Sequence, residues 1–226
     1  GVSVRKFALV DVVATDASYF GSDMIALLPD GRLYRAGITG GTPQLLRTGV
    51  TDFALRNETY TARGPLGLFV RRNATTLYLA LGHPVTHSGP GRLLGFDLTP
   101  GARGEFVEFD AGPAFRVTSV AVDSNRIFLA RTPSTGQPNS DLLRRDSPAK
   151  PTLTNPGDPD YATIGLAREF RSLRSTGRVV YFAHGNTIQR LLVNAPAVDL
   201  DFEAFAVEAT QAIQNLDNTV PLAAGK

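Results

Sequence analysis

One pattern recurs four times along the 226 residues of this chain. Each unit has a hydrophobic run, a polar bend and a second, shorter run that lies close to an arginine. The hydrophobic runs are residues 24–28, 76–81, 126–130 and 178–183, and the shorter runs are residues 31–35, 91–95, 141–145 and 187–191. Repeats of roughly 45 to 60 residues that contain only strand-like segments are typical of β-propeller blades. The repeat therefore predicts an all-β fold, either a propeller or a propeller segment, with about four four-stranded blades.

The repeat also divides the chain into units. We expect a single domain over residues 1–226, with units at about 1–50, 51–115, 116–160 and 161–205. The expected strands of the first unit are residues 7–13, 24–28, 33–36 and 44–47, and those of the fourth are residues 164–167, 179–182, 188–193 and 198–202. Pro29, Asp30 and Gly31 predict a tight turn between two strands, in which glycine supplies a positive φ.

The C-terminal residues 206–226 fit two interpretations. Their place in the repeat predicts the start of a further blade. Their pattern instead indicates a helix that begins slightly earlier, with Asp201 as its N-terminal cap. The apolar stripe of that helix would contain Phe202, Phe205, Ala206, Ala209, Ile213 and Leu216.

Composition excludes several classes of function. The chain has no cysteine, which excludes disulfides, thiolate metal sites and a cysteine nucleophile. No apolar run approaches the roughly 20 residues that cross a bilayer, so we expect no transmembrane segment. The net charge is only +2, and the arginine clusters are not combined with aromatic platforms, so we expect no nucleic-acid partner. Nearly all basic residues are arginine, and abundant Ala, Gly and Pro accompany them, which indicates a GC-rich bacterial genome.

Residues 30–48, DGRLYRAGITGGTPQLLRT, carry a family resemblance. The segment resembles bacterial propeller repeats of the TolB-like and NHL-like kind, in which a polar turn, a short strand, a Gly-rich turn and another short strand form an exposed hairpin. The resemblance covers most of the chain as a periodic pattern, without a catalytic motif. It implies a bacterial extracytoplasmic protein, either periplasmic or secreted.

Three connections are long and rich in Pro, Gly and Ser: residues 82–91, 132–140 and 155–160. By blade order, the first two join second to third strands and the third joins two blades. The resemblance to propellers implies that all three lie on the face where most propellers bind. The candidate binding residues are His83, His87, Pro133, Asp158, Asp160, Tyr161 and His184.

Two kinds of metal site deserve consideration. His83 and His87 are either solvated loop residues or two ligands of one metal, although Pro84 between them excludes a helical pair. Propeller hydrolases gather carboxylates around their channel, often on Ca²⁺, and this chain offers oxygen-bearing residues near its inner strands. They are Asp11, Asp16, Asp52, Asn57, Glu58, Asp123, Asn125 and Glu169. The same residue types also occur in ordinary strand-ending turns, so we assign no catalytic residue and no cofactor, with Ca²⁺ as the alternative.

We therefore expect a non-enzymatic binding or scaffolding module that presents loops on one propeller face to a protein partner. A rigid scaffold that carries long polar loops suits this role. Two alternatives remain: a propeller hydrolase or lyase with a Ca²⁺-centred carboxylate site, and a structural piece of a larger assembly. The sequence does not indicate an oligomeric state.

Overall fold

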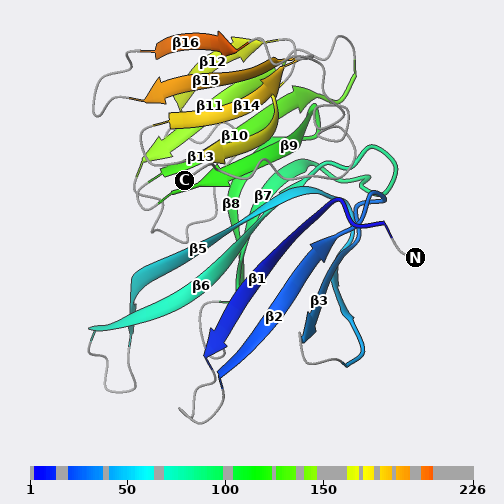
Figure 1. Cartoon of the computed structure of the whole chain (residues 1–226), viewed down its shortest axis with the longest axis vertical. Coiled ribbons are helices and arrows are strands. Elements are labelled where there is room, and N and C mark those ends of the chain that lie inside the picture. Colours follow the sequence, from blue (N-terminus) through cyan, green and yellow to red (C-terminus); the bar gives the residue numbers. More distant parts are fainter. Residues whose placement is uncertain are drawn as a thin grey trace.

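The fold is taken from a computed structural model. It describes residues 3–13, 20–37, 41–63, 69–98, 104–123, 126–135, 140–146, 162–167, 170–175, 179–184, 187–193 and 200–205. Within these ranges there are sixteen strands and no helix, and so no helix long and apolar enough to cross a membrane. The strands form four antiparallel sheets of four consecutive strands each (Figure 1). This confirms the predicted all-β fold built from propeller-like blades.

The four sheets are named blades 1 to 4 in chain order. Blade 1 contains β1 (Lys6–Val13), β2 (Phe20–Leu27), β3 (Leu33–Gly37) and β4 (Gln44–Arg47). Blade 2 contains β5 (Val50–Arg63), β6 (Phe69–Leu81), β7 (Gly91–Asp97) and β8 (Glu105–Gly112). Blade 3 contains β9 (Phe115–Val122), β10 (Arg126–Pro133), β11 (Ser140–Asp146) and β12 (Ala162–Ala167). Blade 4 contains β13 (Arg171–Ser175), β14 (Val179–His184), β15 (Thr187–Val193) and β16 (Leu200–Phe205).

Adjacent blades pack face to face through buried apolar side chains. We call each interface between adjacent blades a seam. Strand β6 contributes to two seams, because successive side chains of a strand point to opposite faces of the sheet. Leu77 and Leu79 belong to the cluster shared with Ile25 of blade 1. Tyr78 and Ala80 belong to the cluster shared with blade 3. A third cluster joins blades 3 and 4.

The first strand of each blade is the innermost. Strands β1, β5, β9 and β13 together line a cavity of about 290 Å³ near the axis of the array. Strand β9 packs beside both β5 and β13. Hairpin β5–β6 is longer than the others and extends away from the array as the long cyan projection of Figure 1.

The boundary between the third and fourth units differs from the prediction. Residues 164–167 belong to β12, which pairs with β11 as the outer strand of blade 3, and the first strand of blade 4 is β13. The prediction was wrong because β12 (ATIGLA) has the apolar pattern of an inner strand, whereas β13 (RSLRS) has the composition of a surface segment. Residues 155–160 consequently lie between two strands of blade 3 and do not join two blades.

The predicted C-terminal helix is wrong in its first turn. Phe202 and Phe205 lie in β16, which pairs with β15, and Asp201 lies opposite Leu192. Pairing with the free edge of β15 supplies backbone hydrogen bonds that override a weak helix propensity. Residues 206–226 lie outside the described residues, so the choice between a helix and a further blade stays a prediction.

The predicted tight turn at residues 29–31 is confirmed. Gly31 has a φ of 83°, a conformation that glycine adopts without steric cost. A Cβ at this position would also lie 2.8 Å from the His83 ring. The glycine is therefore required both by the backbone of blade 1 and by the close approach of blade 2.

Candidate functional site

The β6–β7 connection, residues 82–90, is fixed to blade 1 by His83, whose exposure is only 9%. Its Nε2 lies 3.0 Å from the carbonyl oxygen of Pro29, and its Nδ1 lies 3.0 Å from Thr86 Oγ1. Thr86 Oγ1 also lies 2.9 Å from the carbonyl oxygen of Asp30, the alternative acceptor for its single proton. Both ring nitrogens of His83 therefore have partners within the protein. His83 is therefore not a solvated loop residue, and it links the β2–β3 turn to the β6–β7 loop.

Backbone hydrogen bonds reinforce this link. The amides of Gly82 and His83 both donate to the carbonyl oxygen of Gly49 at 3.1 Å, and the Val50 amide donates to Gly31 at 3.0 Å. The His87 amide donates to the His83 carbonyl at 3.0 Å and closes a turn within the loop. The start of the loop is thus held by the connection between blades 1 and 2.

His87 is half-buried and also makes a structural contact. Its Nε2 lies 2.9 Å from the carbonyl oxygen of Pro90, which closes the second half of the loop. The ring borders a depression of about 540 Å³ that Leu45, Thr48 and Ser88 also line. The depression lies where the loop of blade 2 meets the outer strand of blade 1.

Val85 forms the exposed tip of this fixed loop. Its side chain is 85% exposed, and its neighbours Pro84 and Thr86 are exposed too. The Val85 amide points toward His83 Nδ1 at 3.4 Å. The loop therefore holds one apolar side chain outward next to a buried anchor.

The β10–β11 connection begins at the same end of the molecule as the β6–β7 connection. Pro133 pairs with Phe115 at the start of β9, and the Ser134 amide donates to Ala114 at 2.8 Å. A Cβ on Gly91, the first residue of β7 at the end of the β6–β7 connection, would lie 2.4 Å from the Phe115 carbonyl oxygen. The predicted placement of residues 82–91 and 132–140 on one face is therefore confirmed for their described parts.

The side chains of the remaining candidate residues lie outside the described part of the chain. Asp158, Asp160 and Tyr161 lie outside the described residues, in the segment of the chain between β11 and β12. The prediction that their connection shares a face with the first two depended on an inter-blade connection, and the residues that would test it lie outside the described part of the chain. His184 ends β14 opposite Thr187, and its side chain lies outside the described residues. A binding role for these four residues stays a prediction.

A buried polar network crosses the array beside the axial cavity, and the sequence indicated only one of its members, Asp52. Lys6 Nζ lies 2.5 Å from Asp52 Oδ1 and 4.8 Å from the centre of the Phe53 ring. Asp52 Oδ2 accepts hydrogen bonds from the Ser119 hydroxyl at 2.6 Å and from the Val120 amide at 3.1 Å. The Ser119 oxygen accepts a 3.0 Å hydrogen bond from the Leu173 amide.

This network perturbs both of its charged groups. Burial lowers the pKa of Lys6 from 10.5 to about 8, although Asp52 acts in the opposite direction. Burial opposes ionisation of Asp52, but the positive charges of Lys6 and Arg174 outweigh it and lower its pKa below 3.8. The rarity of lysine was one signal in the sequence that could have pointed to Lys6, because it is one of only three lysines in a chain whose other basic residues are arginine.

The axial cavity has apolar walls and a cationic end. Phe53, Leu55 and Val122 are among its wall residues, and Lys6 and Arg174 supply the charge. Since Asp52 neutralises one of these two cations, a positive charge remains. The arrangement suits a small ligand that combines an apolar body with an anionic group.

The carboxylates do not gather as a metal site in the described part of the chain. No three His, Asp or Glu side chains lie together there with the geometry to hold a metal ion. Asp52 binds Lys6 and Ser119, and Asp123 accepts from the Ser175 hydroxyl at 2.9 Å. Side chains of the other candidates, Asp11, Asp16, Glu58, Asn125 and Glu169, lie outside the described residues, and exposed Asn57 accepts from Thr75.

Comparisons with known proteins give structural likenesses only. No protein-family model matches the sequence, and no curated protein matches it. Among solved structures, the chain is similar to an oligogalacturonate lyase from Vibrio parahaemolyticus, with 11% sequence identity and a TM-score of 0.40. The match covers 84% of this chain and 50% of the lyase, so this chain spans about half the length of that protein.

Proposed function

We propose that this chain is a non-enzymatic binding module that presents the β6–β7 loop, and the β10–β11 loop beside it, to a protein partner. The observation that carries the proposal is the combination of a buried anchor, His83, with an exposed apolar tip, Val85. The resemblance of residues 30–48 to TolB-like and NHL-like repeats supports a bacterial, extracytoplasmic setting for this interaction.

The physical argument is preorganisation. A loop that is already fixed loses little conformational entropy on binding, so a partner gains most of the free energy of burying Val85. The depression beside His87 lies next to the tip and offers space for a side chain from the partner. A fixed projection next to a depression favours recognition of one specific surface.

The test is site-specific photo-crosslinking in the organism that makes the protein, with a photoreactive phenylalanine analogue at position 85. We expect one discrete cross-linked protein, and we expect Val85→Glu in the otherwise natural chain to abolish co-purification of that protein. The matched control is Thr42, an exposed residue of the β3–β4 connection at the other end of blade 1. The same cross-links at positions 85 and 42, or unchanged co-purification with Val85→Glu, would contradict the proposal.

The axial cavity favours a second candidate function, the binding of a small organic anion. Benzoate is a suitable probe because it joins an apolar ring to a carboxylate, and benzyl alcohol is its neutral control. We expect benzoate to raise the melting temperature, benzyl alcohol to have no effect, and Arg174→Gln to remove the benzoate effect. Equal shifts with both compounds, or none with benzoate, would exclude this candidate.

A further inference from the structure

One face of blade 1 is apolar and uncovered by any described residue. Phe7, Leu9, Met24 and Leu45 are 56%, 64%, 36% and 48% exposed. Leu9 lies opposite Met24 in the pairing of β1 and β2, so both side chains are on one face. The other face of the sheet is buried against blade 2. We call the uncovered surface the leading face of blade 1.

Strand register identifies the residues of blades 2 and 3 that occupy the same positions as those of the leading face of blade 1. Phe7 pairs with Ala26 as Phe53 pairs with Leu79 in blade 2 and as Val120 pairs with Leu129 in blade 3. The same correspondence holds for the pairs Leu9–Met24, Leu55–Leu77 and Val122–Ile127, and for Tyr34–Leu45 and Leu94–Val107. In blades 2 and 3 these residues pack against the preceding blade. The leading face of blade 1 is therefore a seam-forming surface whose partner blade is not among the described residues.

The opposite end of the array carries the complementary surface. Tyr181 and Ala183 of β14 point away from blade 3, since Val180 and Phe182, which alternate with them along the strand, are buried against it. We call this surface the trailing face of blade 4. Its residues Tyr181, Ala183 and Ile188 correspond by register to Tyr78, Ala80 and Leu93 of blade 2 and to Phe128, Ala130 and Leu142 of blade 3. In blades 2 and 3 this set of an aromatic residue, an alanine and an aliphatic residue packs against the following blade.

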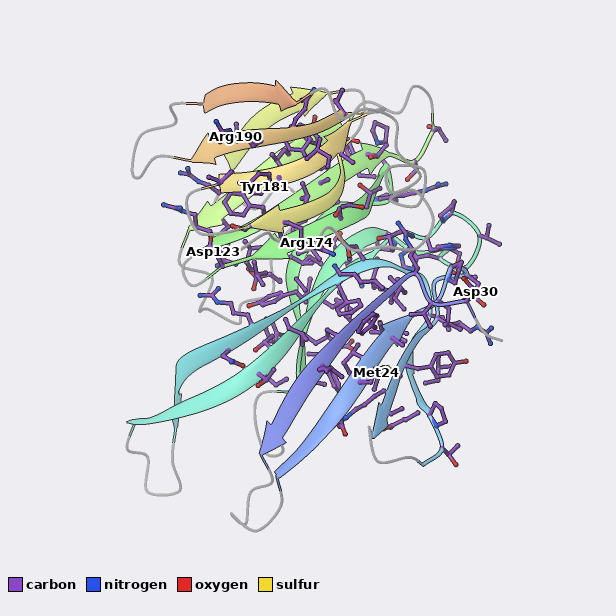
Figure 2. The ribbon with its side chains drawn as sticks, in the orientation of Figure 1. Met24, Asp30, Asp123, Arg174, Tyr181 and Arg190 are labelled. Atoms are coloured by element: carbon purple, nitrogen blue, oxygen red, sulfur yellow. The ribbon has the colours of Figure 1, made fainter. Side chains whose placement is uncertain are left out.

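The two faces lie at opposite ends of the array of blades. Figure 2 shows Met24 on blade 1 and Tyr181 on blade 4, with blades 2 and 3 between them. No strand of blade 1 packs extensively on a strand of blade 4 among the described residues. The two faces thus do not cover each other within one chain.

We propose that two copies of this chain associate head to tail, with the leading face of blade 1 in each copy packed on the trailing face of blade 4 in the other. The commitment to a second copy rests on the register: the trailing face carries the residue pattern that covers the leading faces of blades 3 and 4. A twofold arrangement forms two such seams at once and leaves neither apolar face in water. The first strands of both copies then line a shared channel.

The first test is the mass of the chain in solution, measured by light scattering. We expect a dimer that Met24→Glu converts to a monomer with unchanged circular dichroism, while Thr42→Glu leaves the dimer intact. A monomeric natural chain at micromolar concentration would overturn the proposal. A complex with three or more copies would overturn it as well, because head-to-tail closure by two copies leaves no free face.

The second test identifies the faces in contact and uses the absence of cysteine from the chain. Met24→Cys and Tyr181→Cys are prepared separately, mixed and treated with a short bismaleimide. We expect cross-linked dimers from the mixture and none from either variant alone. Cross-linking of Met24→Cys alone would show that two leading faces meet, and an unreactive mixture would show that the trailing face is not the partner; either result would overturn the proposal.

Discussion

Lys6 and Asp52 form an ion pair inside the array, with Nζ 2.5 Å from Oδ1 and side-chain exposures of 13% and 9%. The same carboxylate accepts from Ser119, and the Ser119 oxygen accepts from the amide of Leu173. These four residues belong to β1, β5, β9 and β13. One line of polar contacts therefore connects the first strands of all four blades.

The lowered pKa of Lys6 predicts stability that rises with pH. Lysine in the unfolded chain keeps its proton up to about pH 10.5, whereas folded Lys6 loses it near pH 8. Between these values the unfolded state binds more protons, so the free energy of unfolding increases with pH. Relative to Lys6→Met, we expect a gain of up to about 3 kcal/mol between pH 8 and 10.5. Urea unfolding of both proteins across this range measures it, and parallel pH profiles would contradict it.

Asp52 predicts a change at acidic pH. Because its folded pKa lies below 3.8, its contribution is complete above that value and is lost as the pH falls through the folded pKa. We expect Asp52→Asn to be less stable than the natural chain by about 3 to 5 kcal/mol at pH 7, because Lys6 is left buried without a counter-charge. The deficit should shrink below pH 3.8. A deficit that does not change with pH would show that the carboxylate has no ionic role.

We expect removal of the Ser119 hydroxyl to lower the free energy of unfolding, because it leaves the buried Leu173 amide without an acceptor. Ser119→Ala removes the acceptor of the Leu173 amide and a donor to Asp52. We expect a loss of about 1 to 3 kcal/mol in the free energy of unfolding. Ser134→Ala is the matched control, since that exposed hydroxyl makes one hydrogen bond of 3.3 Å. Equal losses for the two variants would refute a special role for the buried network.

Two glycines separate backbone strain from steric contact. Gly31 and Gly41 have φ values of 83° and 120°, but a Cβ on Gly31 meets His83 and Thr86 whereas a Cβ on Gly41 meets nothing within 4 Å. We expect Gly31→Ala to cost about 1 to 3 kcal/mol more than Gly41→Ala in chemical unfolding. Similar costs for the two substitutions would mean that the β2–β3 turn and the β6–β7 loop are not in close contact.

The sequence predicted the fold well where a strand is apolar and a turn has its characteristic residues. The hairpins around Gly31 and Gly91 follow from a 2-residue periodicity and turn chemistry, and both lie where they were expected. The sequence-based prediction missed β13, because Arg171 and Arg174 give this strand the composition of a surface segment. Leu173 is its only apolar residue, and it is buried in the cluster between blades 3 and 4. Local composition does not show that the burial of Leu173, together with the hydrogen bond from its amide to Ser119, places β13 as an inner strand.

The candidate site was predictable only in part. The two long connections on one face followed from blade order, but the function of His83 depends on Pro29, 54 residues away in the chain. The polar network was not predictable, because Lys6, Ser119 and the Leu173 amide have no shared motif. They meet only because three seams bring four first strands together, which is a property of packing and not of local sequence.

Amide hydrogen exchange tests the central claim, that the β6–β7 loop is held as part of the seam between blades 1 and 2. The amides of Gly82, His83, Val50 and His87 all donate to backbone carbonyls of this seam or of the loop itself. We expect them to exchange as slowly as the amides of β6, and to lose that protection in His83→Ala while β6 keeps its own. Exchange of these four amides at the rate of an unstructured peptide in the natural chain would contradict the account.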